Sequence, residues 1–186
     1  MGYSLEGLVT STIAAEMQLL PTVPLRQGLS LIPLPKNEQA HGDVTRQMAD
    51  TFMQLSSKTY GLALRMSYNA PVAYLEAELF AAAGTQSAVV WRNGVVVLGP
   101  MIHDTDSGGL WADPDKPCAS WPFNAALRLL GVQGEDVDEF DTIGLGQHRH
   151  TKDWIPAKPP SAQLPGAQGT AETGGFADSG SGQPTQ

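Results

Sequence analysis

The sequence predicts one α+β domain built on an antiparallel sheet, with helices packed on one face and a disordered C-terminal tail. Residues 72–80 alternate between apolar and polar or aromatic side chains, which is the pattern of a half-buried strand. Asn93-Gly94 lies between two runs of β-branched residues and indicates a tight hairpin. Apolar residues recur at helical spacing in the stretches 44–55 and 123–130, which indicates helices beside the sheet.

The first element predicted along the chain is a helix from about Thr10 to Leu20. Ile13, Met17 and Leu20 recur at helical spacing, and the prolines that follow at 21 and 24 end the pattern. The alternating stretch 28–34 is predicted to be a strand at the edge of the sheet, because it contains a proline and is followed by another.

Two helices are predicted next. Asp43 is the expected N-cap of the first, whose apolar positions are Val44, Met48, Phe52 and Leu55. Ser56 or Ser57 is expected to cap the second helix, which carries Leu62 and Met66 and ends before Pro71.

The middle of the chain is predicted to form a three-stranded antiparallel meander at about 71–98. Ala73, Leu75, Ala77 and Leu79 point to one face of its first strand, on which the helices are expected to pack. The opposite face is expected to be outward and carries a row of residues: Val72, Tyr74, Glu76, Glu78 and Phe80.

A long loop rich in Asp, Gly and Pro follows at 103–120, and loops of this length are often functional. A helix is predicted to begin at Ser120 or Trp121, with Pro122 in its first turn and Gly131 after its end. One short helical turn is expected around Val137 and Phe140. The stretch 156–186 is rich in Pro, Gly and Ser and poor in large apolar residues, so the predicted folded domain is 1–155.

Charge and cysteine content narrow the function classes. The chain has 19 acidic and 11 basic residues and a formal net charge of −8, and residues 103–141 contain nine acidic residues against two basic ones. Free nucleic acid is therefore not expected as a partner, whereas a basic protein is. No apolar stretch is long enough to span a membrane, no secretory leader is apparent, and Cys118 is the sole cysteine. A cytoplasmic protein without membrane contact is expected.

The candidate partner-binding residues are acidic and aromatic. They are the outward row of the predicted meander and the start of the acidic loop: Tyr74, Glu76, Glu78, Phe80, Asp104 and Asp106. Glu76 and Glu78 share one face of a strand, so they could also divide acid and base roles or hold a cation. A purely solvated sheet face is the remaining alternative.

His148 and His150 form an H-x-H pair, and Asp153 follows closely. Such a pair serves zinc or iron sites when a third ligand is near. Arg149 and Lys152 add positive charge beside the pair, so no metal and no cofactor is expected; if a metal is bound, these three residues are the predicted ligands.

Three stretches together resemble a group of small bacterial proteins, some of which are similar to immunity proteins of polymorphic toxin systems. They are 71–78, then 84–86 with 88–91, then 138–140 with 144–146 and 148–150. The resemblance covers about residues 25–155 and implies no catalytic residue.

The predicted function is a non-enzymatic acidic protein-binding module, such as an immunity or inhibitor protein of a bacterial toxin system. One alternative is a small enzyme or metal-binding protein that uses Glu76 and Glu78 with His148 and His150. A second alternative is a structural component of a bacterial or phage assembly.

Overall fold

The computed structural model describes residues 2–12, 20–35, 43–80, 83–104, 120–134 and 138–155. The chain divides into two units, Met1–Pro156 and Ala157–Gln186, and only the first is described below. The predicted disordered tail, Asp106, Cys118, Val137 and most of the predicted 10–20 helix lie outside the described residues.

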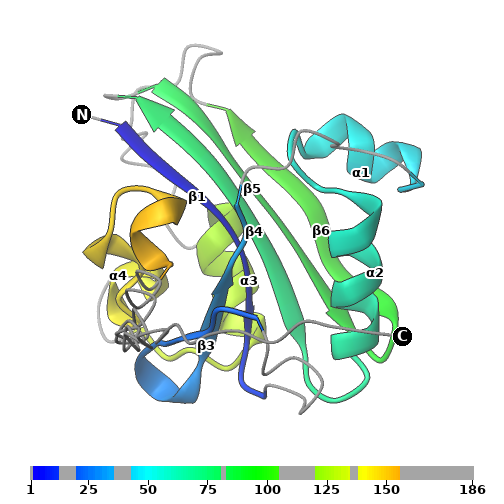
Figure 1. Cartoon of the computed structure of the whole chain (residues 1–186), viewed down its shortest axis with the longest axis horizontal. Coiled ribbons are helices and arrows are strands. Elements are labelled where there is room, and N and C mark those ends of the chain that lie inside the picture. The colour runs from blue at the N-terminus through cyan, green and yellow to red at the C-terminus, as the bar shows by residue number, and fades with distance from the viewer. Residues whose placement is uncertain are drawn as a thin grey trace, which may run out of the picture. The chain divides into compact units, whose positions relative to one another are not determined.

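A six-stranded antiparallel sheet forms the centre of the domain and confirms the α+β class (Figure 1). The strand order is β2-β3-β1-β4-β5-β6. The strands are β1 (Gly2–Thr10), β2 (Val23–Pro24), β3 (Ser30–Pro33), β4 (Val72–Phe80), β5 (Ala83–Arg92) and β6 (Val95–Asp104). The described part contains no helix long and apolar enough to cross a membrane.

The first element of the chain is the strand β1, whereas the sequence predicted a helix beginning at about Thr10. Thr10 ends this strand and does not begin a helix. All nine residues of β1 pair with β4, from Gly2 opposite Phe80 to Thr10 opposite Val72. This pairing joins segments about 70 residues apart, so the local sequence of β1 does not reveal which strand it pairs with. The predicted edge position of the 28–34 strand is also wrong, because β3 lies between β1 and the two-residue edge strand β2.

The meander β4-β5-β6 is confirmed. The turn between β5 and β6 consists of Asn93 and Gly94, both with positive φ (52° and 76°). Such a turn matches the right-handed twist of the strands that it joins. The turn is also held from outside the hairpin, because the Asn93 and Gly94 N–H groups donate to the Ser67 carbonyl oxygen and to Ser67 Oγ.

The helices are short, and their caps follow local sequence. They are α1 (Arg46–Thr51), α2 (Ser57–Met66), α3 (Pro122–Leu129) and α4 (Glu139–Thr142), with 3₁₀ turns η2 (Arg26–Gly28), η4 (Leu145–Gln147) and η5 (Thr151–Trp154). Ser56 caps α2 and Pro122 opens α3, as expected. Asp43 is not the cap of α1; Thr45 is, because its side chain accepts the Met48 N–H.

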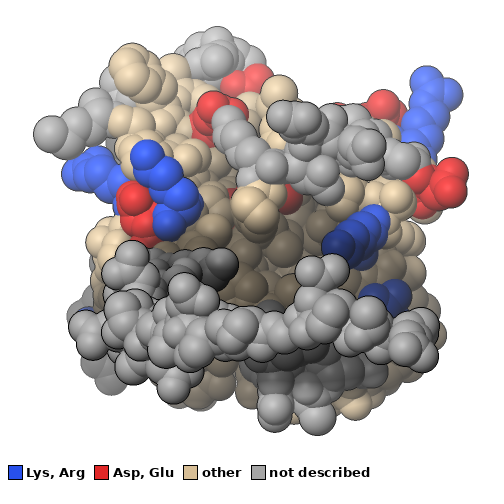
Figure 2. Space-filling view, in the orientation of Figure 1, with Lys and Arg blue, Asp and Glu red and all other residues tan. Residues whose placement is uncertain are grey.

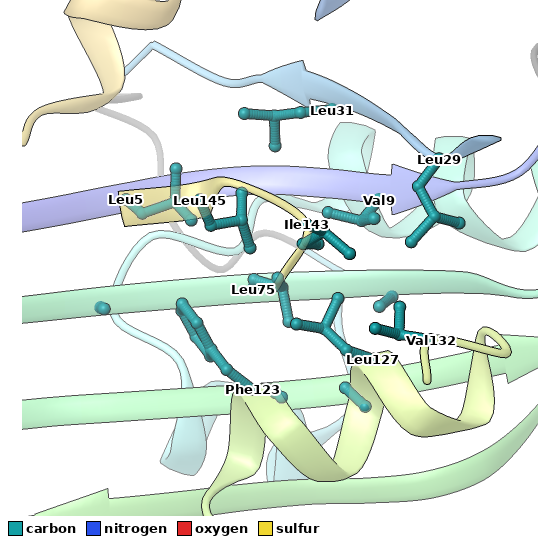
Figure 3. Packing of buried hydrophobic residues seen from close by; sticks show 14 of the residues in the cluster. Leu5, Val9, Leu29, Leu31, Leu75, Phe123, Leu127, Val132, Ile143 and Leu145 are labelled. Atoms are coloured by element: carbon teal, nitrogen blue, oxygen red, sulfur yellow. The ribbon is translucent and has the colours of Figure 1, made fainter. Parts of the chain in front are cut away.

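Helices pack on both faces of the sheet, which therefore has two cores. The expected Ala/Leu face is covered by α3 and the segments after it; Figure 3 shows Phe123 and Leu127 of α3 directed toward Leu75 of β4. The opposite face carries the second core, in which Tyr74 and Trp91 pack with Phe52 of the α1–α2 region. The face expected to be outward is thus covered over half of its length.

Candidate functional site

Three polar side chains meet at the point where the second core ends. Glu6 of β1 lies directly opposite Glu76 of β4, and Tyr74 lies two residues before Glu76 on the same face. We call Glu6, Tyr74 and Glu76 the carboxylate cluster. Tyr74 is fully buried, and Glu6 is only 4% exposed.

The Tyr74 hydroxyl group lies between the two carboxyl groups. It is 3.0 Å from Glu76 Oε2 and 3.2 Å from Glu6 Oε1, and it donates to these oxygens. A phenol has a single proton, so the two contacts alternate unless one carboxyl group is itself protonated. Burial raises the pKa of Tyr74 far above its ordinary value, and the charges of Glu76 and Glu6 raise it further. The phenol therefore stays protonated and remains a donor.

Glu76 also fixes the connection between α1 and α2. Its Oε1 accepts the Met53 N–H at 2.8 Å, and its Oε2 accepts the Gln54 N–H at 3.1 Å. These are hydrogen bonds to a carboxylate from backbone groups that no helix satisfies. Glu76 consequently links the sheet to the helical layer, and its oxygens are occupied.

The row predicted to bind a partner is thus divided in two. Tyr74 was expected on an exposed face, and this is wrong because α1 and α2 cover it. Glu76 is half-buried within the carboxylate cluster, whereas Glu78 and Phe80 are exposed beyond the end of the helical layer. The reason is packing between distant segments, which strand periodicity does not encode.

Beyond the helices, the same face of the sheet presents an acidic and apolar area. Glu78 lies opposite Thr85 on β5, and Thr85 lies opposite Asp104 on β6, so the three residues form one row. Phe80 and Ile102 flank this row and are 73% and 54% exposed. We call these five residues the sheet-end surface: Glu78, Phe80, Thr85, Ile102 and Asp104. Figure 2 shows charged side chains, acidic ones among them, along the upper part of the molecule.

The predicted H-x-H pair, His148 and His150, lies next to β1, beyond the Glu78 end of the row Glu78–Thr85–Asp104. The backbone of His148 and His150 is extended, and His150 forms a parallel bridge with Ser4 of β1. His150 Nδ1 lies 3.1 Å from Ser4 Oγ, whereas the His148 ring packs edge-on against Trp154. The two imidazoles therefore have different partners.

No described group of three or more His, Cys, Asp or Glu side chains could hold a metal ion. Asp153 is exposed in η5 and does not join the two histidines in such a group. The alternative function was a small enzyme or metal-binding protein that uses Glu76 and Glu78 with His148 and His150. The described residues do not bring these four side chains together in one site.

A cavity of about 320 Å³ lies next to the Ser4–His150 pair, with Pro35, Lys152 and Ile155 in its lining. A hydroxyl group beside an imidazole is activated in hydrolases when a third group orients the imidazole. Among the described residues, no carboxylate bonds to His150. The Ser4 N–H also donates to the Arg149 carbonyl oxygen at 2.7 Å. These contacts attach the 149–151 segment to β1.

Two acidic residues of the 103–141 stretch, Asp138 and Glu139, form contacts within the domain. Asp138 caps α4 by accepting the Phe140 N–H at 3.0 Å, and Glu139 forms an ion pair with Arg128 of α3 at 3.1 Å. Burial raises the pKa of Asp138 above its ordinary value. Asp104, in contrast, is exposed at the end of β6, on the sheet-end surface.

Glu6 is the member of the carboxylate cluster that the sequence analysis missed. Tyr3, Leu5 and Val9 alternate along β1 and pack toward the α3 core. That alternation was the available signal for a strand, and it places Glu6 on the opposite face.

No family model, curated protein or solved structure matches this chain. The resemblance to immunity proteins therefore stays a prediction.

Proposed function

We propose that this protein is a non-enzymatic binding module that docks a basic protein partner on the sheet-end surface. An immunity or inhibitor protein that neutralises its partner is the form of this function that we favour. The supporting observation is the row Glu78–Thr85–Asp104, which is flanked by the exposed Phe80 and Ile102.

The composition of this surface suits binding better than catalysis. Aromatic and aliphatic side chains supply buried area in a complex, and acidic side chains set orientation and speed of approach. The formal net charge of −8 adds a long-range attraction for a basic protein, which can raise association rates by about 10- to 1000-fold at low salt. Phe80 and Ile102 are large apolar side chains that stay exposed in the folded domain, and their burial in a complex would contribute to binding.

Site-specific photo-crosslinking in the native host tests this proposal. A benzophenone amino acid replaces Phe80 in one variant and Arg26 in the control variant. Arg26 is exposed in η2 at the far end of the sheet, where Ser30 pairs with Thr10, whereas Phe80 pairs with Gly2 at the near end.

We expect a basic protein to be crosslinked at position 80 and not at position 26. We also expect the adduct to be lost when the crosslinker variant additionally carries Glu78→Lys and Asp104→Lys. Equal adducts at both positions, no adduct at position 80, or an adduct that persists in the charge-reversed chain would contradict the proposal.

A further inference from the structure

The outer edge of β6 has no strand partner among the described residues, because β6 pairs only with β5 and ends the strand order. An edge strand presents backbone N–H and C=O groups to which another strand can pair. Natural edges are commonly protected by charged side chains. The first part of this edge carries no charged side chain: Val95, Val96 and Val97 are consecutive and are 60%, 41% and 43% exposed. Its register with β5 is irregular between Val96 and Met101.

The edge has two chemically different halves. Pro100 separates them, because proline has no backbone N–H to offer a partner. The half 95–98 is apolar. The half 101–104 keeps a regular register with 85–88 of β5 and carries Ile102 and Asp104 of the sheet-end surface. The edge is thus continuous with the proposed docking surface.

We propose that the partner docks by adding an extended segment to the sheet as a strand antiparallel to β6. Its basic side chains lie beside Ile102 and Asp104, and its apolar side chains lie beside Val95–Leu98. This inference rests on the proposed function and specifies which part of the partner enters the surface. Because the added strand runs antiparallel, basic residues come first along the partner segment and apolar β-branched residues follow.

Charge selects a basic partner over a second copy of this chain. Two copies each carry a formal net charge of −8, and β6 contains no Lys or Arg with which a copied strand could pair Asp104. A net charge far from zero disfavours the association of two copies of this chain. A basic segment gains from the same charges, and antiparallel pairing is slightly more stable per residue than parallel pairing.

Fluorescently labelled synthetic peptides test this inference. Each has about ten residues, which is about twice the usual length of a strand. The parent peptide alternates Lys and Thr in its N-terminal half and Val and Thr in its C-terminal half. Controls are the reversed sequence, a peptide with Glu in place of Lys, and two backbone N-methylated peptides, each methylated at one alternate set of nitrogens. Binding is measured by fluorescence anisotropy, and amide hydrogen exchange locates the contact.

We expect the parent peptide to bind and to slow exchange in β6. N-methylation of the set that faces β6 should weaken binding at least about tenfold, while the other set has little effect, because alternate residues of a strand direct their N–H groups to opposite sides. The reversed and Glu peptides should bind more weakly. Val96→Lys should reduce binding of the parent peptide, whereas Leu129→Lys in α3 should not.

Two outcomes would overturn the strand addition. The first is no binding of the parent peptide. The second is binding that both N-methylated peptides retain equally. In the second case, loss of binding in the variant with Glu78→Lys and Asp104→Lys would leave the proposed function intact, with side-chain docking in place of strand addition. Crosslinking at position 80 tests the proposed function separately.

Discussion

Glu6 and Glu76 lie directly opposite each other on β1 and β4, and the hydroxyl group of Tyr74 contacts both carboxyl groups. Like charges in this arrangement repel each other unless donors lie between or beside them. The phenol supplies one donor, and the backbone N–H groups of Met53 and Gln54 supply two more. The cluster thus closes the second core where the sheet-end surface begins.

Replacement of Tyr74 by Phe tests the role of the phenol. Tyr74→Phe keeps the ring that packs against Phe52 but removes the donor shared by the two carboxyl groups. We expect the free energy of unfolding to fall by about 1–3 kcal/mol, as for a buried polar group that loses its partner. Urea denaturation measures the change; a loss below about 0.5 kcal/mol would show that the phenol is dispensable.

Replacement by alanine should have different effects on stability at two glutamates of β4. Glu76→Ala leaves the Met53 and Gln54 N–H groups without their carboxylate acceptor, so we expect a loss of about 2 kcal/mol or more in the free energy of unfolding. Glu78→Ala at the exposed position should change it by less than about 0.5 kcal/mol. Equal losses in the two variants would contradict the division of the row into a structural and a surface part.

The hairpin turn should not tolerate a side chain at its second position. Gly94 has φ of 76°, a backbone conformation that residues with a Cβ atom rarely adopt, and a Cβ atom there would also displace the exposed Tyr68 side chain. We expect Gly94→Ala to lower the free energy of unfolding by about 1–3 kcal/mol. Asn93→Gly, which keeps the turn conformation accessible, is the control and should have a much smaller effect. A Gly94→Ala protein as stable as the wild type would exclude the proposed strain.

The pH dependence of stability should change when Asp138 is replaced by Asn. The pKa of Asp138 is raised in the folded protein, chiefly by burial. Its protonated form is therefore favoured by folding, and its penalty on stability appears as pH rises through the folded pKa. Asn keeps an oxygen for the Phe140 N–H but has no charge to desolvate.

We therefore expect Asp138→Asn to gain stability relative to the wild type between about pH 3 and about pH 7 in urea titrations. Asp138→Ala, which loses the cap, should be less stable than Asp138→Asn at both values by about 1 kcal/mol. An Asn variant whose relative stability falls with rising pH would show that the charge of Asp138 stabilises the fold.

Local signals predicted the elements that depend on few residues. Asn93-Gly94 fixed the hairpin, Ser56 began α2, and Pro122 and Gly131 bounded α3, because turns and caps act within a few residues. The strand β1 and the burial of Tyr74 depend instead on pairing and packing between segments far apart in the sequence. The candidate site was predicted in part for the same reason: alternation placed Glu78 and Phe80 on one face, but could not show where α1 and α2 end.

The proposed function requires the sheet-end surface to capture a basic partner through charge. The most direct test is stopped-flow association of the crosslinked partner, once purified, with the wild type and with the Glu78→Lys, Asp104→Lys variant, over a range of salt concentrations. We predict that the variant associates at least about tenfold more slowly at low salt and that the difference shrinks as salt screens the charges over about 10 Å. Association at the wild-type rate in a variant whose circular dichroism is unchanged would contradict the claim.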